Sequence, residues 1–326
     1  MNAVLARVHG GPDAAGVVRH DFSTNANACG PCPAALEAVR NADAARYPDP
    51  DSKQLRRQLA ELHGVAAARI VPAASASEFI FRITAWAARQ GVRAVALPAH
   101  AYGDYAAAAR AWGLQLAPRA ELAWACEPSS PWGRQEAGIE ARMTEDGILV
   151  IDRAYEPLRL AGATSLDTAT LARAWQLWSP NKALGLCGVR GAYAIAPTGR
   201  EDAVAELDAL APSWPLGAHG VAMLAAWCAP EVQQWVAASR TTLRDWKPRQ
   251  LAMCRGFGWQ VQEEGSANFF VAAAPGVCAT LRSRGLRLRD CASFGLPGHV
   301  RLSVQSPGTQ DALRAAMEER ACSRAA

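Results

Sequence analysis

Short apolar runs alternate with longer stretches of helical spacing over most of this sequence, and this alternation constrains the fold more than any other feature. The apolar runs predict strands at 92–98, 122–126, 147–152, 175–179 and 191–196. Helical spacing of apolar residues predicts helices at 52–63, 77–90 and 102–113. Strands and helices in this order are typical of an α/β fold with a mostly parallel central sheet.

The pattern changes after about residue 210. A long helical region at 217–257 is followed by short strands at 268–274, 286–291 and 300–305, and then by a final helix from Thr309. This order predicts a second, smaller α+β domain. We therefore expect three parts, namely an N-terminal arm and segment that packs on the small domain (1–45), a large ligand-binding domain (46–210) and the small C-terminal domain (211–326).

Composition narrows the possible partners. Half of the 326 residues are apolar and the net charge is +4, which is too small and too scattered to favour nucleic acid. No apolar run has the length of a membrane span, and the first residues lack the apolar core of a signal peptide. Nine mostly isolated cysteines indicate a reducing compartment. We expect a cytoplasmic protein that binds neither membranes nor nucleic acid.

Residues 29–32 read Cys-Gly-Pro-Cys, as in thioredoxin-type redox centres. Such a centre follows a strand, whereas the preceding residues 21–28 are polar and turn-like. A short helix is expected from Pro33, with Cys32 placed to cap it. No second CxxC or histidine pair completes a zinc site, so no metal is expected. Thiol-redox chemistry by Cys29 and Cys32 stays open as an alternative.

The segment 178–197 carries the strongest chemical signal. Lysines are scarce in the chain, and Lys182 follows a predicted strand among small and apolar neighbours. Burial of an ammonium is costly and lowers its pKa, and the neutral amine is the nucleophile that attacks an aldehyde. From this segment alone, a surface lysine on a loop is an equally good interpretation.

Three other segments fit one cofactor. Asp152 ends a buried-strand pattern, so it is expected at the carboxyl edge of the sheet, where a carboxylate can hold the protonated ring nitrogen of pyridoxal phosphate. An N-cap or a structural ion pair is the alternative role for Asp152. Small residues at 74–77 begin a helix whose N–H groups favour a phosphate, and Tyr102 offers a ring for stacking.

Taken in order, these segments resemble the fold-type I pyridoxal-phosphate enzymes, the aspartate aminotransferase superfamily. The matching stretches span nearly the whole chain: 9–11, 21–31, 46–51, 150–155, 178–197, 266–271, 286–295 and 300–307. Within the superfamily the chain looks most like the threonine-phosphate decarboxylases of cobalamin biosynthesis, which are related to the histidinol-phosphate aminotransferases. The resemblance implies the α/β fold of that type, pyridoxal 5′-phosphate (PLP) as cofactor and a homodimer.

The resemblance also implies a role for each matching residue. Lys182 would bond to the cofactor aldehyde, Asp152 would pair with the ring nitrogen, and Tyr155 would reach the ring hydroxyl. Tyr102 would stack on the ring. The cofactor phosphate would be met by Ala76, Ser77, Ser179, Arg190 and the neighbouring subunit's Tyr47. The substrate would be met by Arg301 at its carboxylate and, around its phosphate, by His9, Gly10, Asn25, Asn27 and Arg289.

The chain departs from the family pattern at one functional stretch. The usual N-P-x-N-P-x-G reads Glu-Pro-Ser-Ser-Pro-Trp-Gly at 127–133, so Ser130 stands where an Asn normally contacts the cofactor oxygen. The expected reaction is decarboxylation of L-threonine O-3-phosphate to (R)-1-amino-2-propanol O-2-phosphate and CO₂. An aminotransferase acting on a phosphorylated amine such as histidinol phosphate is the closest alternative. A relative that binds the cofactor but has lost catalysis also stays open.

Overall fold

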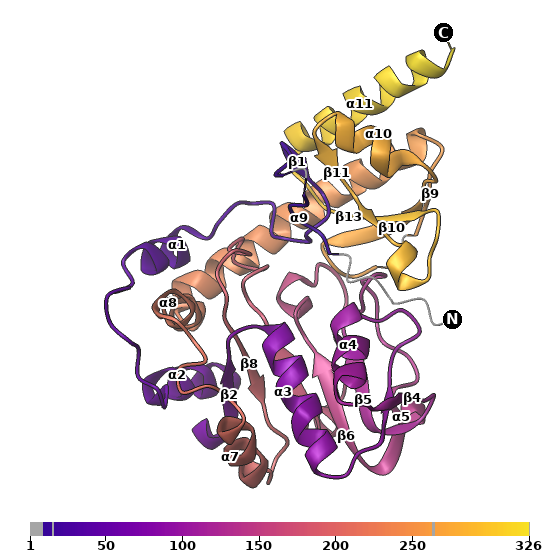
Figure 1. Cartoon of the computed structure of the whole chain (residues 1–326). Coiled ribbons are helices and arrows are strands. Elements are labelled where there is room, and N and C mark those ends of the chain that lie inside the picture. The colour runs from indigo at the N-terminus through magenta and orange to yellow at the C-terminus, as the bar shows by residue number, and fades with distance from the viewer. Residues whose placement is uncertain (1–8, 15, 263–264, 326) are drawn as a thin grey trace.

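The computed structural model describes residues 9–14, 16–262 and 265–325. Its largest element is a seven-stranded sheet (Figure 1). In spatial order the strands are β2 (Ile70–Ala73), β8 (Ala192–Ile195), β7 (Trp175–Trp178), β6 (Met143–Asp152), β5 (Ala120–Cys126), β3 (Ala94–Ala96) and β4 (Gln115–Leu116). Only β8 runs antiparallel to its neighbours, so the expected mostly parallel sheet is confirmed.

Helices cover both faces of this sheet, which is why β5 and the end of β6 read as continuous apolar runs. One face packs against α3 (Ala76–Arg89), α4 (Gly103–Ala111) and α7 (Glu201–Ala209). The other face packs, near β2 and β8, against α1 (Pro33–Arg40), α2 (Lys53–His63), α8 (Ala218–Trp227) and α9 (Pro230–Gly256). Two short helices, α5 (Ile139–Arg142) and α6 (Thr168–Arg173), complete this layer.

A second, antiparallel sheet lies at the far end of α9 (Figure 1). Its strands, in spatial order, are β12 (Arg289–Asp290), β13 (His299–Ser303), β10 (Phe269–Ala273) and β9 (Gln260–Val261). A separate core joins this sheet to α9, α10 (Val277–Ser283) and α11 (Pro307–Ala325). The long helical region expected at 217–257 is in fact two helices, because Pro230 cannot continue α8 and instead begins α9.

The N-terminal segment contacts both halves of the molecule. Strand β1 (His20–Asp21) pairs in parallel with β11 (Leu286–Arg287), and Phe22 is buried in the core of the second sheet. Farther along, α1 packs on α8 beside the large sheet. The domain boundaries at 45 and 210 stay a prediction.

No helix in the described part of the chain is both long and apolar enough to cross a membrane.

Candidate active site

A cavity of about 840 Å³ lies at the carboxyl ends of β5, β6 and β7. Parallel sheets bind ligands at this edge because several strands and their loops end there together. The second sheet and the N-terminal segment supply the remaining walls, so the cavity lies between the two halves of the chain. All but three of the expected site residues line it, and the exceptions are Tyr47, Asn25 and Asn27.

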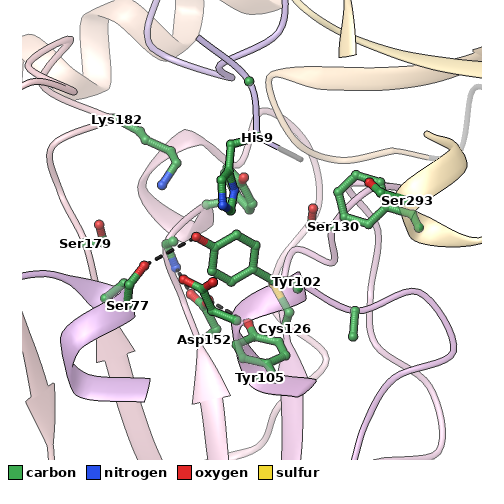
Figure 2. Close-up of a pocket in the computed structure, with 18 of the residues that line it drawn as sticks. His9, Ser77, Tyr102, Tyr105, Cys126, Ser130, Asp152, Ser179, Lys182 and Ser293 are labelled. Carbon is green, nitrogen blue, oxygen red and sulfur yellow. Dashed lines mark hydrogen bonds between the residues drawn. The ribbon is translucent and has the colours of Figure 1, made fainter. Parts of the chain in front are cut away.

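Asp152 projects from the end of β6 into the floor of the cavity (Figure 2). Its Oδ1 accepts the N–H of Ala154 at 2.9 Å, and its Oδ2 accepts the hydroxyl of Tyr105 at 2.7 Å. Burial raises the pKa of Asp152, while these two hydrogen bonds and the charge of Lys182 oppose the rise. The carboxylate is therefore held in a fixed orientation by two donors and keeps further lone pairs for a ligand.

Lys182 lies on the turn that follows β7, with its amine directed toward the space above Asp152 (Figure 2). The Nζ atom is 5.4 Å from the ring centroid of Tyr155. Tyr155 is buried and packs edge-on against Phe269 at 4.8 Å between ring centroids. An amine from the turn after β7 and a carboxylate and a phenol from the end of β6 thus surround one space.

The segment around Asn27 supports the lysine turn from outside the cavity. The backbone N–H of Asn27 donates to the carbonyl of Lys182 at 2.9 Å, and its Nδ2 donates to the carbonyl of Ala183 at 2.9 Å. The N–H of Cys32 donates to the carbonyl of Leu184 at 2.8 Å. The side-chain oxygen of Asn27 accepts the N–H of Cys29.

The expectation that Asn25 and Asn27 touch a substrate phosphate therefore has no support in the geometry. The amide of Asn27 is occupied by the protein itself. Asn25 is fully buried away from the cavity lining, and its amide makes no hydrogen bond in the described part of the chain. Asn27 lies behind the lysine turn, whereas the carbonyl of Asn25 accepts from the side chain of Asn268.

The Cys-Gly-Pro-Cys stretch belongs to the same support. Cys32 precedes α1 as its N-cap residue, but its thiol makes no capping hydrogen bond. Burial raises the pKa of Cys29, which is the opposite of what an activated redox thiolate needs. Among the residues that the structure describes, no group of three potential metal ligands is present.

The first turn of α3 and several polar side chains meet at one part of the cavity. Ser75 caps the helix by accepting the N–H of Glu78 at 3.1 Å, which leaves the first turn facing the cavity. The hydroxyl of Ser77 lies 3.3 Å from that of Tyr102. Ser179 and Arg190 line the cavity beside this turn. A helix N-terminus with hydroxyls and a guanidinium is suited to a phosphate group.

Arg289 and Arg301 face each other across the β12–β13 pair and line the opposite wall. Arg301 donates from Nη1 to the hydroxyl of Ser130 and from Nη2 to the carbonyl of Ser23, each at 3.1 Å, while its buried Nε makes no hydrogen bond in the described part of the chain. Burial, and then the charge of Arg301, lower the pKa of Arg289 to about 10. Two buried cations this close favour an anionic ligand between them.

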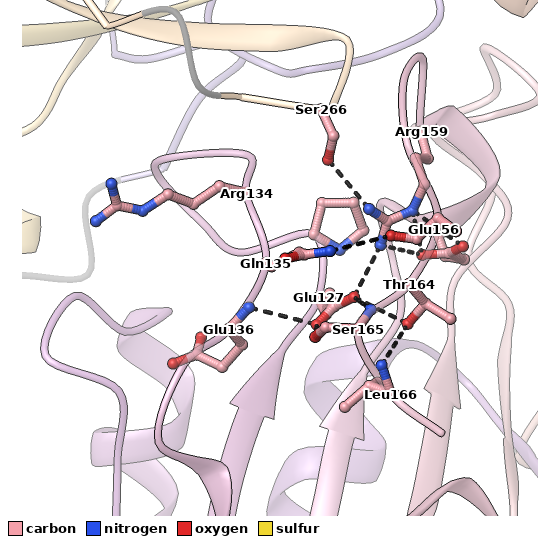
Figure 3. A network of polar contacts seen from close by, with 12 residues as sticks. Glu127, Arg134, Gln135, Glu136, Glu156, Arg159, Thr164, Ser165, Leu166 and Ser266 are labelled. Carbon is pink, nitrogen blue, oxygen red and sulfur yellow. Dashed lines mark hydrogen bonds and ion pairs between the residues drawn. The ribbon is translucent and has the colours of Figure 1, made fainter. Parts of the chain in front are cut away.

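The loop that carries Ser130 is fixed by a buried polar network around Glu127 (Figure 3). The fully buried carboxylate of Glu127 accepts hydrogen bonds from Arg159 at 3.1 Å and from the hydroxyl of Thr164 at 2.8 Å. It also accepts the N–H of Ser165 at 2.7 Å. Burial alone raises the pKa of Glu127, but the hydrogen bonds outweigh this effect and hold it below its ordinary value.

Sequence reasoning missed several residues that line the cavity, namely Ser23, Tyr105, Cys126 and Ser293. Ser293 accepts a hydrogen bond from Arg289 at 2.6 Å. The sequence did hold a signal for Tyr105. It comes three positions after Tyr102 at the start of a helix, and residues three apart lie on one helix face, so it could be expected to face the same cavity.

Comparison with known proteins agrees with this geometry. The family model described as "Aminotransferase class I and II" matches residues 20–125 and 139–319, and so leaves out the loop that holds Glu127 and Ser130. The chain is similar to the histidinol-phosphate aminotransferase of Symbiobacterium thermophilum, with 27% identity over 345 residues that cover 92% of each protein.

Two solved structures show the same fold. Histidinol-phosphate aminotransferase from Sinorhizobium meliloti, in complex with pyridoxal-5′-phosphate, superposes with a TM-score of 0.77 at 19% identity and covers 93% of this chain and 90% of that chain. L-threonine-O-3-phosphate decarboxylase from Porphyromonas gingivalis superposes with a TM-score of 0.72 at 20% identity, and the match covers 91% of this chain and 98% of that chain. The expected fold of type I is confirmed. Because the family match spans most of the chain, this protein belongs to the aminotransferase class I and II family.

Proposed function

We propose that this chain is a PLP-dependent enzyme that acts on a small phosphorylated amine or amino acid. PLP is the cofactor, and the observation that carries this conclusion is the placement of Lys182, Asp152 and the α3 N-terminus around one cavity. The donor set fits the cofactor, since an amine, a buried carboxylate and an anion site are the groups that its aldehyde, ring nitrogen and phosphate require. Tyr102 supplies a ring to cover one face.

Asp152, Lys182 and Arg301 have different roles in the proposed reaction. When bound, PLP supplies an aldehyde for covalent attachment and a ring that withdraws electrons from Cα of the attached amine. Asp152 holds the proton on the ring nitrogen. Lys182 provides the amine for attachment and, once released, moves the proton at Cα. Arg301 binds a carboxylate in a bidentate way that a lysine would reproduce poorly.

Transamination of a phosphorylated amine such as histidinol phosphate is the reaction that the comparisons favour, because the curated relatives that match are histidinol-phosphate aminotransferases. For that reaction the residues of the site would have to orient the substrate so that its Cα–H bond is the one that breaks. Arg301 and Arg289 then hold the anionic groups of the amine and of the oxo acid that accepts its nitrogen.

Decarboxylation of threonine phosphate is the second candidate, favoured by the sequence resemblance and by the facing pair of Arg289 and Arg301. Threonine phosphate carries both a carboxylate and a phosphate, so each arginine would have an anion to bind. For this reaction the residues would have to orient the substrate so that its carboxylate is lost instead. The choice between the two reactions therefore depends on how these arginines orient the substrate.

One assay separates the candidates. Purified protein with PLP is incubated with threonine phosphate alone, or with histidinol phosphate and 2-oxoglutarate. Release of CO₂ in the first mixture supports the decarboxylase, and formation of glutamate in the second supports the aminotransferase. Borohydride reduction must attach the cofactor to Lys182 in either case, whereas a Lys182→Ala variant must stay unlabelled. Labelling without any turnover would instead identify a relative that has lost catalysis.

We further propose that the enzyme is a homodimer and is cytoplasmic. Tyr47 is 78% exposed and does not line the cavity of its own chain. An exposed tyrosine at this position supports the role that the resemblance implied, contact with the cofactor phosphate of a second copy.

A further inference from the structure

Tyr105 is a fully buried side chain with no role in the chemistry described above. It lies in the first turn of α4, three residues after Tyr102, and its hydroxyl donates to Oδ2 of Asp152 at 2.7 Å (Figure 2). This is a direct hydrogen bond from a helix on one face of the sheet to the carboxylate at the end of β6.

The ring of Tyr105 is held from two sides. It stacks on Trp124 of β5 with 4.4 Å between ring centroids and an interplanar angle of 11°. Tyr102 packs against it edge-on at 5.7 Å and 81°. These two ring contacts restrict the rotation of the side chain and favour the orientation in which the hydroxyl of Tyr105 reaches Asp152.

The electrostatics fix which partner donates. Burial, and then the negative charge of Asp152, raise the pKa of Tyr105 well above its ordinary value, so the phenol keeps its proton. Whenever Asp152 is ionised, it is therefore the acceptor in this pair. Because the second oxygen of Asp152 is oriented by the N–H of Ala154, the whole carboxylate is fixed before any ligand arrives.

We propose that Tyr105 is a positioning residue that fixes Asp152 as an ionised acceptor for the ring nitrogen of the cofactor. This inference rests on the proposed function. One turn of helix delivers both Tyr102, which covers the face of the ring, and Tyr105, which orients the acid at its nitrogen. The two contacts are therefore set together by the start of α4.

The test compares Tyr105→Phe with Tyr193→Phe. Tyr193 is also fully buried, and its hydroxyl bonds to His63 at 2.7 Å and Trp227 at 3.1 Å, but it lies on β8 outside the cavity lining. Each variant loses one buried, hydrogen-bonded hydroxyl. The readouts are the dissociation constant for PLP, the ¹⁵N resonance of PLP labelled at its ring nitrogen, and the steady-state constants.

We expect Tyr105→Phe to weaken PLP binding about ten-fold, because a hydrogen bond to a charged carboxylate is lost. Its ¹⁵N resonance should move toward that of the neutral ring, and kcat should fall about ten-fold while KM changes less than about two-fold. Tyr193→Phe should leave all of these values unchanged. 3-Fluorotyrosine at position 105 is a stronger donor and should move the ¹⁵N resonance the other way.

An unchanged ¹⁵N resonance and PLP affinity in folded Tyr105→Phe would overturn the proposal and leave Tyr105 a purely structural residue. Equal changes in Tyr193→Phe would overturn it as well. If Tyr105→Phe does not fold, the fluorotyrosine variant decides, and no shift there refutes the proposal. Failure of the unmodified protein to bind PLP would refute the proposed function itself, which the same titration detects separately.

Discussion

Arg301 shows how much of the candidate site depends on single residues. Its guanidinium reaches Ser130 in the loop after β5 and the carbonyl of Ser23 in the N-terminal segment, and it lies over the ring of Phe269 at 5.4 Å. The planar fork of arginine can make these bonds and still present one N–H pair to a carboxylate. A lysine has one nitrogen and cannot serve all of these positions.

The change Arg301→Lys should therefore raise KM for a carboxylate-bearing substrate by about ten-fold or more, with a smaller change in kcat. Steady-state kinetics over a range of substrate concentrations measures both constants. Arg282→Lys is the control, because among the described residues Arg282 bonds to Asp13 and Gly16 at the surface, away from the cavity. Equal KM values for the two variants would contradict a role of Arg301 in substrate binding.

Several site residues could be predicted one by one, and others could not. Lys182, Asp152 and Tyr155 lie where the resemblance placed them, since each follows a strand whose apolar pattern is strong. Substrate contact by Asn27 stays a prediction, but its Nδ2 donates to Ala183, 156 positions away, and residue type alone does not distinguish an amide that binds ligand from one that binds backbone.

At the scale of elements, the lysine turn is packed directly against the Cys-Gly-Pro-Cys stretch. Gly185 has a φ of +66°, and a Cβ added there would lie 2.5 Å from the carbonyl oxygen of Gly30. Gly64, at the end of α2, has a similar φ of +62° but nothing within 4 Å of an added Cβ. Any other residue would therefore be strained at both positions, but only at position 185 would its Cβ also collide with a neighbouring backbone.

Alanine at each glycine separates these effects. Gly64→Ala should lower the free energy of unfolding by about 1 kcal/mol through backbone strain alone. Gly185→Ala should cost at least about 1–3 kcal/mol more, because backbone must move, and it should also slow attachment of PLP to Lys182. Urea unfolding and the rate of the absorbance change on PLP addition measure the two effects. Equal losses in both variants would show that the contact with Gly30 is not tight.

The buried network around Glu127 makes the Ser130 loop sensitive to acid. The pKa of Glu127 lies below its ordinary value in the folded chain, so its charge stabilises the fold above the unfolded pKa, and this stabilisation is lost as pH falls through the folded pKa. Glu127→Gln removes the charge and keeps the shape.

We expect Glu127→Gln to lower the free energy of unfolding by about 2 kcal/mol at neutral pH and by less as pH falls below about 4. Urea unfolding at several pH values measures this. Glu140→Gln is the control, because Glu140 pairs with Arg173 on the surface and should matter by less than about 0.5 kcal/mol at every pH. A difference that does not depend on pH would contradict the assigned ionisation of Glu127.

Strands of the large sheet could be predicted where the apolar sequence runs were long, whereas the short strands β2 and β4 were not predicted. Five strands of the large sheet match their expected ranges closely. Strand β2 contains Pro72, which weakens a strand pattern, and β4 has two residues, too few for any periodicity. Their places at the two edges of the sheet come from pairing with neighbours and not from local sequence.

At the scale of the whole molecule, an exposed aromatic pair indicates how two chains could meet. Tyr47 stacks on Trp214 at 4.4 Å between ring centroids, and the indole N–H of Trp214 donates to the carbonyl of Pro48 at 3.2 Å. Tyr47 is 78% exposed and Trp214 45%. The stacking holds Tyr47 in one orientation at the surface, where the proposed second copy could reach it.

Mixing two defective variants tests this arrangement. Lys182→Ala lacks the amine, and Tyr47→Ala lacks the tyrosine donated to the other chain. If sites are shared, refolding an equal mixture should produce heterodimers with one complete site, and activity at limiting PLP should return to about a quarter of the normal value. A mixture that is no more active than the sum of its parts would contradict a shared site. Sedimentation equilibrium checks that dimers form.

The path of residues 20–32 has a practical consequence for protein engineering. Residues 20–21 form a strand beside β11, and residues 27–32 donate hydrogen bonds to the turn after β7. The same short segment therefore contacts both the C-terminal part of the chain and the turn that carries Lys182. A chimera in which only the C-terminal part is exchanged would keep the original β1 but replace its partner β11, so the contacts between them would no longer match. Chimeras should therefore exchange both ends of the chain together.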